Sequence, residues 1–332
     1  MSNDEHTTPG NGKPTPGAAA DVLTSRGRST IHLGDLLFGG SARASSLVIV
    51  VVVLIIGAFL LGNAWQPLLD NTANFFTSTT FDSSSRPPHF GIAALLWTTV
   101  LSSVIALLVA VPVAIGIALL LTQYVGGRVS REIGFVVDLL AAVPSVIFGL
   151  WGIKVLGPAL QPVTHWMQTH LGWFPLFGST QVTSPGTVFT ASLVLALMIL
   201  PIITAVTRDV FAQTPREQIE AALALGATRW EVIRMAVLPY GRSGATAAAM
   251  LGLGRALGET IAVMLILSAS SFDVSVFSGG ETFASVIARN AAEFDTTYKA
   301  GIYISAGLVL FVLTFAVNAL ARIVAERGKA KS

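Results

Sequence analysis

The sequence has no cysteine and few charged residues, and each shortage excludes a class of protein. Without cysteine, the 332-residue chain can form no disulfide framework, thiolate metal site or cysteine nucleophile. Charged residues make up 11% of the chain, against about 25% in a typical soluble domain. The net charge of +2 provides no broad basic surface for nucleic acid. These shortages together exclude an ordinary cytoplasmic enzyme.

Several enzyme motifs are missing as well. The sequence contains no G-x-x-x-x-G-K-[ST] phosphate loop, so the chain cannot hydrolyse ATP by that route. The H-E-x-x-H and G-x-S-x-G patterns are also absent, which argues against an intramembrane protease or a lipase. His165 and His170 are too sparse for a metal site. We therefore expect no catalytic residue, no metal site and no cofactor bound by this chain.

Long hydrophobic segments take the place of the missing charge. Hydrophobic residues make up 53% of the chain, and its mean hydropathy is +0.71. Six segments approach the roughly 20 residues that a helix needs to cross a bilayer. They lie at 44–66, 92–122, 135–157, 186–207, 244–271 and 301–324. The strict alternation of a β-barrel is absent, so we expect an all-α integral membrane protein with six transmembrane helices.

The ends of the chain differ from this membrane domain, which we place at 41–326. Residues 1–40 begin with a stretch rich in Pro, Gly, Thr and Ser, which predicts a flexible tail. Within the tail, 31–38 is either a short interfacial helix or a linker. Residues 327–332 form a short polar C-terminal end.

The distribution of cations predicts the orientation in the membrane. Three of the twenty Lys and Arg residues, Arg86, Arg289 and Lys299, fall on one side, and two, Lys154 and Arg255, fall within spans. The other fifteen lie in the tail, the loops 123–134 and 208–243, and the C-terminus. Cytoplasmic loops carry the excess of positive charge, so both termini should be cytoplasmic.

An outward loop at 158–185 has no Lys or Arg but several aromatic residues. Trp166, Trp173, Phe174 and Phe177 are either anchors at the membrane interface or a docking surface for an extracytoplasmic partner.

The cytoplasmic loop 208–243 contains two helix starts. Thr214-Pro215-Arg216-Glu217 has the pattern of a capping box with proline at the first helical position. That helix should end at Gly226 in a left-handed turn. Thr228-Arg229-Trp230-Glu231 repeats the capping box and starts a helix expected to run to Leu238, with Pro239 at its end. Helix capping alone is equally compatible with a hairpin lying on the membrane and with a docking element.

Residues in this loop resemble the EAA loop of ABC importer permeases. The matching positions are Glu220, Ala221, Ala222, Gly226, Ala227, Leu238 and Pro239. The sequence departs from the family pattern at Ala236, where the family has isoleucine. The resemblance implies a coupling helix that docks on an ATP-binding subunit dimer, with ATP and Mg held by that partner. It also implies a second permease subunit and an extracytoplasmic binding protein that delivers the substrate.

Two further stretches are similar to the permeases of phosphate ABC importers. These are AAVPSVIFGLWG at 141–152 and GLGRALGETIAV at 252–263. The long first loop and the six-span layout are similar to the C-type subunit of those importers. The resemblance covers roughly residues 40–325 and implies the MetI-like architecture of type I importers, an A-type permease partner and a phosphate-binding protein.

Arg255 and Glu259 stand out inside the fifth predicted span. Arg255 is 11 residues into it, about 17 Å along the helix and near the midplane. Glu259, four residues on, should lie on the same face. The pair is either a substrate pathway in which Arg255 holds phosphate, or a static salt bridge that permits insertion. Lys154, placed near the outer end of the third span, either snorkels to the interface or assists anion entry.

Other functions remain open from the residues alone. One is a permease for another oxyanion, such as sulfate, molybdate or phosphonate. Another is a transporter or channel that works without ATP, although the chain has no convincing half-to-half repeat. A third is a membrane-embedded enzyme or scaffold, for which transport would not depend on Gly226.

Overall fold

The computed structural model describes residues 33–85, 87–178 and 184–329. Residues 1–32 of the expected tail, Arg86 and the last three residues lie outside the described residues. The chain divides into two compact units, 1–55 and 56–332. Helix α2 (Leu33–Asp70) belongs to both units, because the division falls within it. Residues 33–40, which were assigned to the tail, are therefore helical.

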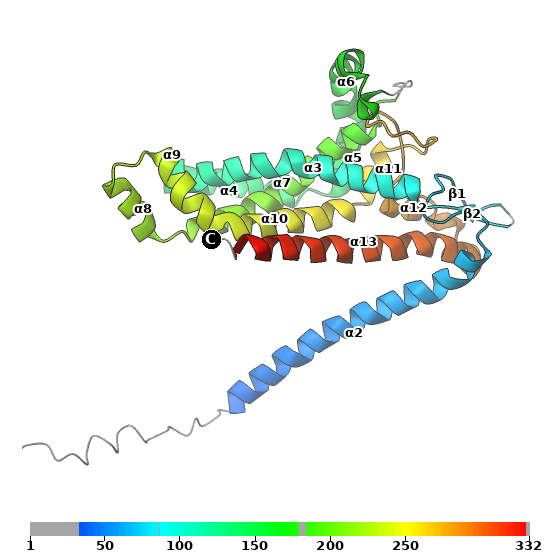
Figure 1. Cartoon of the computed structure of the whole chain (residues 1–332), viewed down its shortest axis with the longest axis horizontal. Coiled ribbons are helices and arrows are strands. Elements are labelled where there is room, and N and C mark those ends of the chain that lie inside the picture. Colours follow the sequence, from blue (N-terminus) through cyan, green and yellow to red (C-terminus); the bar gives the residue numbers. More distant parts are fainter. Residues whose placement is uncertain (1–32, 86, 179–183, 330–332) are drawn as a thin grey trace, which may run out of the picture. The chain divides into compact units, whose positions relative to one another are not determined.

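Four long helices of the second unit lie side by side (Figure 1). They are α3 (Ala93–Leu119), α7 (Val188–Ala212), α10 (Leu238–Leu257) and α13 (Thr297–Lys329). Helix α7 packs on both α3 and α10, and α10 also packs on α13. The remaining part of α2 meets α13, where a side chain at Gly301 would collide with the Asn63 carbonyl. The expectation of an all-α membrane protein is confirmed.

Small residues let these helices approach closely. Ala106, Ala110 and Ala114 repeat at every fourth position of α3 and are fully buried. They share a core with Leu195 and Ile199 of α7. Lipid is as apolar as leucine, so close packing of small residues, more than burial from water, holds such helices together.

The third predicted span is displaced along the chain. Helix α4 (Gly127–Ala141) ends before Pro144, and a new helix begins at Ser145. Proline disfavours the helical conformation of the residue before it, which explains the break. The new helix comprises α5 (Ser145–Trp151), the wide turn η2 (Gly152–Leu156) and α6 (Gly157–Leu171). Together these form an apolar helix from Ser145 to Leu171 that is long enough to cross a membrane. The limits predicted for this span, 135–157, are therefore wrong, and so is the prediction that a loop begins at 158.

The fifth predicted span is not a single helix. Helix α10 ends at Leu257, and the short helix α11 (Ile261–Ile266) follows after a break of three residues. In the described part of the chain, five helices are individually long and apolar enough to span a membrane: Arg43–Asp70, Ala93–Tyr124, Ser145–Leu171, Val188–Ala212 and Thr297–Leu320. The α10–α11 segment is the fifth predicted span, and it is broken.

Shorter elements gather at the two ends of the bundle (Figure 1). One end has α8 (Arg216–Ala224), α9 (Arg229–Val232) and the wide turn η4 (Ile233–Val237). The opposite end has α12 (Phe283–Arg289), with the turn η5 (Ala291–Glu293) directly after it. At this end β1 (Phe81–Asp82) pairs with β2 (His89–Phe90), with Phe81 opposite Phe90. Two further turns complete the described elements: η1 (Leu120–Tyr124) after α3 and η3 (Pro175–Phe177) after α6.

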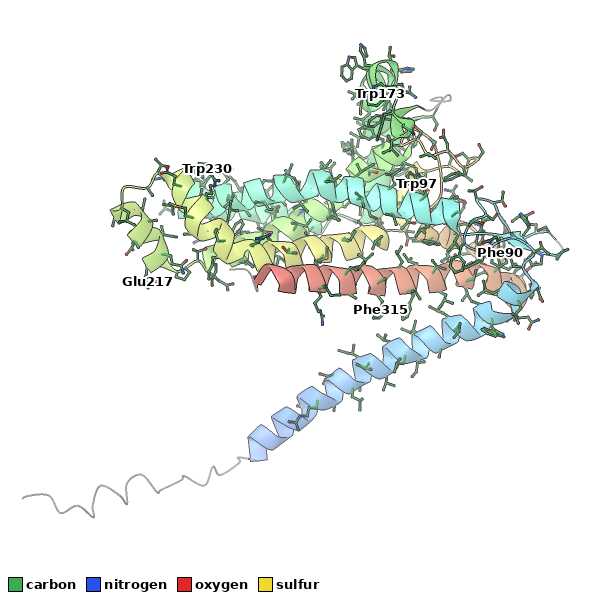
Figure 2. The ribbon with its side chains drawn as sticks, in the orientation of Figure 1. Phe90, Trp97, Trp173, Glu217, Trp230 and Phe315 are labelled. Carbon is green, nitrogen blue, oxygen red and sulfur yellow. The ribbon has the colours of Figure 1, made fainter. Side chains whose placement is uncertain are left out.

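The aromatic residues expected in the loop at 158–185 have two different environments. Trp166, on α6, and Trp173 expose 57% and 81% of their surface, and Figure 2 shows Trp173 beside α6, outside the row of long helices. Phe177 instead packs on Phe277, with ring centroids 5.8 Å apart. Phe174 exposes 40% of its surface, so Trp166, Trp173 and Phe174 are free to meet a membrane interface or another protein, whereas Phe177 is not.

Candidate functional site

The break between α10 and α11 shapes the first candidate site. The Gly258 and Glu259 amides still donate to carbonyls of α10, at 3.3 and 3.4 Å. Glu259 then turns its side chain toward α11, where its Oε1 accepts a hydrogen bond from the Ala262 amide at 3.3 Å. The carboxylate is therefore held at the first turn of α11.

Arg255 and Glu259 do not form the ion pair that their spacing predicted. The helix ends between them at Leu257, so the two residues no longer share one regular helical face. Among the described residues no ion pair joins them. Arg255 is exposed on this chain and Glu259 is half-buried. A static salt bridge between the two is not the arrangement in this structure.

Both residues instead line one cavity of about 720 Å³. Its walls come from α7, α10, the break and α13. The lining residues are Ile202, Ala247, Met250, Leu251, Gly254, Arg255, Gly258, Glu259 and Asn318. The polar groups are thus a guanidinium, a carboxylate and an amide in a mostly apolar wall. Sequence reasoning missed Asn318, because its role depends on α13 lying against α10.

Lys154 lies elsewhere than expected. It is in the wide turn η2, in the middle of the helix from Ser145 to Leu171, and its side chain is exposed. The prediction that it lies near the outer end of a span is wrong, because the span itself is displaced.

The α8–α9 segment forms the second candidate site. Gly226 has φ +84°, which confirms the left-handed turn between the two helices. The capping box of α9 is also confirmed: the Glu231 carboxylate accepts from the Thr228 amide at 2.7 Å, and the Glu231 amide donates to the Thr228 hydroxyl at 3.4 Å. The Thr228 hydroxyl also donates to the Glu231 carboxylate at 2.8 Å, and the two hydrogen bonds that this carboxylate accepts from Thr228 lower the pKa of Glu231.

Two local expectations for this segment are wrong. The first capping box does not form, since the Thr214 hydroxyl donates back to the Phe211 carbonyl at 2.9 Å and Pro215 takes the cap position. The second helix does not end at Leu238, because it continues through η4 into α10, with Pro239 directly after the wide turn.

The surface of this segment is apolar and exposed. Leu225 exposes 89% of its surface, and Trp230 and Met235 each expose 59%. Figure 2 shows Trp230 on α9 and Glu217 on α8 at this end of the bundle. The described chain leaves most of the Trp230 surface uncovered.

A groove of about 630 Å³ runs between α8 and α9. Ala221, Ala222, Gly226 and Ala227 line it, together with Ala236. Glu220 is exposed on α8, whereas Leu238 and Pro239 line a different cavity, of about 470 Å³, beside α3. The residues of the predicted coupling motif are therefore divided between two surfaces.

No cluster suited to a metal ion is present in 33–85, 87–178 or 184–329.

A row of packed membrane helices, a broken helix at a polar cavity and an exposed apolar element at one end define a polytopic membrane permease. The family described as binding-protein-dependent transport system inner membrane component matches residues 110–329. The chain belongs to this family.

Two individual relatives give a more specific comparison than the family does. The chain is 57% identical over 297 residues to the phosphate transport system permease protein PstC 2 of Mycobacterium tuberculosis, covering 88% of this chain and 92% of that protein. It is 55% identical over 315 residues to the phosphate transport system permease protein PstC of Mycobacterium leprae, covering 93% and 97%. Identity at this level over nearly the full length places the chain among the phosphate transport permeases.

Solved structures support the fold. The inward-facing MetNI methionine ABC transporter matches with a TM-score of 0.53 at 15% identity, covering 71% of this chain and 96% of that chain. A bacterial ABC transporter that imports alginate matches with a TM-score of 0.52 at 17% identity, covering 88% and 98%. The MetI-like architecture expected from the sequence is confirmed.

Proposed function

We propose that this chain is the permease subunit of an ATP-driven importer of inorganic phosphate. The observation that carries the proposal is the high identity to phosphate permeases over nearly the whole chain, which includes the broken helix and its cavity. A guanidinium suits phosphate because it presents paired donors and keeps its charge at every physiological pH.

Arg255 is the proposed phosphate-binding group of the pathway. It is exposed on this chain and has no ion-pair partner among the described residues, so its charge is available to a substrate. Glu259 faces the same cavity and would keep the anion from being held too tightly. A cation at membrane depth is costly unless it faces a cavity or a partner, and the 720 Å³ cavity meets that need.

The α8–α9 end is the proposed cytoplasmic coupling end. Exposed Leu225, Trp230 and Met235 around the small-residue groove suit a partner that binds by close apolar contact. That partner would be the ATP-binding subunit dimer, which holds ATP and Mg. A second, A-type permease would complete the pathway, and a phosphate-binding protein would deliver substrate at the α12 end.

The test is uptake of labelled phosphate by a transport-deficient host that expresses the complete transporter. Arg255→Gln should lower uptake at least about tenfold, because a hydrogen bond to a charged group is worth roughly 1.5–3 kcal/mol. Arg128→Gln is the matched control, since Arg128 is an exposed arginine of α4 that lines neither cavity. Normal uptake by a well-expressed Arg255→Gln variant would disprove the binding role.

Excess sulfate, added as a competitor in the same assay, tests the substrate. Uptake that resists sulfate supports phosphate. Inhibition by sulfate would point to a broader oxyanion permease.

A further inference from the structure

Arg289 makes a group of polar contacts at the α12 end of the bundle, outside the Arg255 cavity. Its Nε lies 2.9 Å from Glu281 Oε1. Its Nη2 donates to the Leu267 carbonyl at 2.6 Å and to the Met264 carbonyl at 3.1 Å. The Arg289 side chain is 33% exposed and that of Glu281 is 18% exposed. One guanidinium thus connects an acidic residue before α12 with the end of α11.

The carbonyls that Arg289 contacts are at the end of α11, where no further turn of helix supplies a partner. At the other end of α11, Glu259 accepts a hydrogen bond from the Ala262 amide. A helix of six residues is too short to hold its own shape. The position of α11, and of Glu259 with it, therefore depends on contacts made by neighbouring elements.

Helix α12 is itself anchored to α3. The Phe283 amide donates to the Thr99 hydroxyl of α3 at 3.2 Å. Phe283 and Ser285 are fully buried, and Thr282 and Ser285 form a capping box at the start of α12. Arg289 thus links α11 to an element that is itself fastened to the long helix α3.

We propose that Arg289 is a positioning residue for transport, which acts as a clasp between α12 and α11 and thereby holds the Glu259 carboxylate at the cavity. Its link to transport rests on the proposed role of the cavity. The clasp itself rests on the contacts of Arg289 and does not need that role.

The chemistry of the contacts requires arginine. The planar guanidinium reaches the carboxylate with Nε and two carbonyls with Nη2, which the single ammonium of lysine cannot reproduce in the same directions. The contact to Glu281 is close but poorly aligned, since Oε1 is buried and accepts no directed hydrogen bond from the described residues. The carbonyl contacts are therefore the better directed part of the clasp.

The experiment uses one cysteine introduced as Thr260→Cys, in the break before α11. Because the chain has no cysteine of its own, this thiol is its only one. The complete transporter in membranes would be treated with a membrane-impermeant maleimide, and labelling of this chain would be followed on a gel. Phosphate uptake would be measured on the same preparations.

Arg289→Gln should increase the rate of Thr260→Cys labelling roughly tenfold and reduce uptake, because charged hydrogen bonds to the α11 carbonyls are lost. Arg289→Lys should give an intermediate labelling rate. The double variant Arg289→Gln/Glu281→Gln removes both charges, so it avoids an unpaired buried carboxylate. It should still label fast, because the carbonyl contacts remain lost.

Lys299→Gln is the matched control. It removes a cation in the first turn of α13 together with its ion pair to Asp295 at 3.0 Å. The Lys299 side chain is 34% exposed, like that of Arg289, and its partner Asp295 is 58% exposed. Its labelling and uptake should equal those of the background variant. Unchanged labelling in assembled Arg289→Gln and in the double variant would overturn the clasp.

The two readouts separate this proposal from the proposed function. Fast labelling with unchanged uptake would overturn the role of the clasp in transport. The binding role of Arg255 is tested by its own variant, Arg255→Gln, and stands or falls independently.

Discussion

At the scale of single residues, backbone conformation decides what can occupy position 226. Gly226 has φ +84°, and a Cβ added there would meet no atom within 4 Å. Space is therefore free, and only the left-handed conformation restricts the choice of residue. Asparagine adopts this conformation more readily than other non-glycine residues, while β-branched residues strongly avoid it.

Gly226→Val should therefore uncouple the transporter and Gly226→Asn should be largely tolerated. The valine would strain the turn by about 1–3 kcal/mol and rotate α8 relative to α9. The measurement is phosphate uptake together with copurification of the ATP-binding subunit. If asparagine proved as harmful as valine, the requirement would be for a bare surface at this position instead of a left-handed turn.

Glu281 gives the α12 end a dependence on pH whose sign can be worked out. Burial raises the pKa of this carboxyl, and the attraction of the nearby Arg289 guanidinium opposes the shift only in part. The Tyr303 hydroxyl of α13 is near enough to interact with the charge of Glu281, and this hydroxyl donates to the Glu293 carboxylate at 3.4 Å. A group with a raised pKa favours the packed state below its ordinary pKa, and this contribution is lost as pH rises through the raised value.

Acidification from neutral pH should thus stabilise the packed α12 end against thermal inactivation in detergent. Glu281→Gln is neutral at every pH and should abolish this dependence. Expressing each inactivation temperature relative to that of the Glu281→Gln variant at the same pH removes the effect of the other titrating groups. An inactivation temperature that falls in acid relative to this variant would contradict the assignment.

At the scale of elements, the contact between α7 and α10 depends on a missing side chain. A Cβ on Gly252 would lie 2.7 Å from Ile203 Cδ1 and 2.9 Å from Cγ1. A Cβ on Gly254, two residues along the same helix, would meet nothing within 4 Å. The two glycines therefore have different reasons to be present, although they look alike in sequence.

Gly252→Ala should lower the stability of the protein by about 1–3 kcal/mol, the usual cost of overpacking. Gly254→Ala should leave stability unchanged or slightly improved, because alanine favours helix more than glycine does. Thermal inactivation in detergent would compare the two. Equal loss in both variants would show that helix flexibility, rather than packing, is the reason for glycine here.

The sequence predicted elements well where the signal was local. The Gly226 turn and the Thr228–Glu231 capping box are set by residues within four positions of each other, and both were found. The break after α10 was harder, because long apolar stretches lie on both sides of Gly258 and 244–271 was interpreted as one continuous helix. The pairing of Arg255 with Glu259 failed for that reason, since it assumed an unbroken helix.

The rest of the site depends on contacts between distant segments. Asn318 lines the same cavity as Arg255 although the two are 63 residues apart in the sequence. Arg289, at the end of α12, donates to carbonyls of the α11 segment. Neither arrangement produces a periodicity or a motif that can be recognised in a single sequence. The family resemblance predicts where the proposed coupling and substrate sites lie, but not which additional side chains contribute to them.

At the scale of the whole molecule, the exposed apolar groove at one end and the buried polar clasp at the other imply different tasks. The α8–α9 end exposes Leu225 and Trp230, as a surface that binds another protein would. The α12 end buries Phe283, Val286 and Ser285. If the ATP-binding subunits act at the α8–α9 end and substrate arrives at the α12 end, the broken helix α10–α11 lies between these two ends and connects them.

The proposed orientation places the α8–α9 end in the cytoplasm. A single cysteine at Thr228 should then react with an impermeant maleimide only in inside-out vesicles, and one at Ser84 only in right-side-out cells. Both positions lie outside the spans, and Ser84 is described in the loop between β1 and β2. The reverse pattern would invert the assignment of both ends.

The uneven hydrophobicity of the helices also bears on how the protein is made. Helix α7 has a strongly apolar window and precedes α10 in the chain. Helix α10 carries Arg255 and several glycines and fails as an independent span among the described helices. The free energy of insertion into lipid should therefore be favourable for α7 and less favourable for α10 on its own. The surface of α7 that contacts Gly252 should therefore also help α10 to insert into the membrane. Weakening this contact should lower the amount of protein in the membrane as well as its stability.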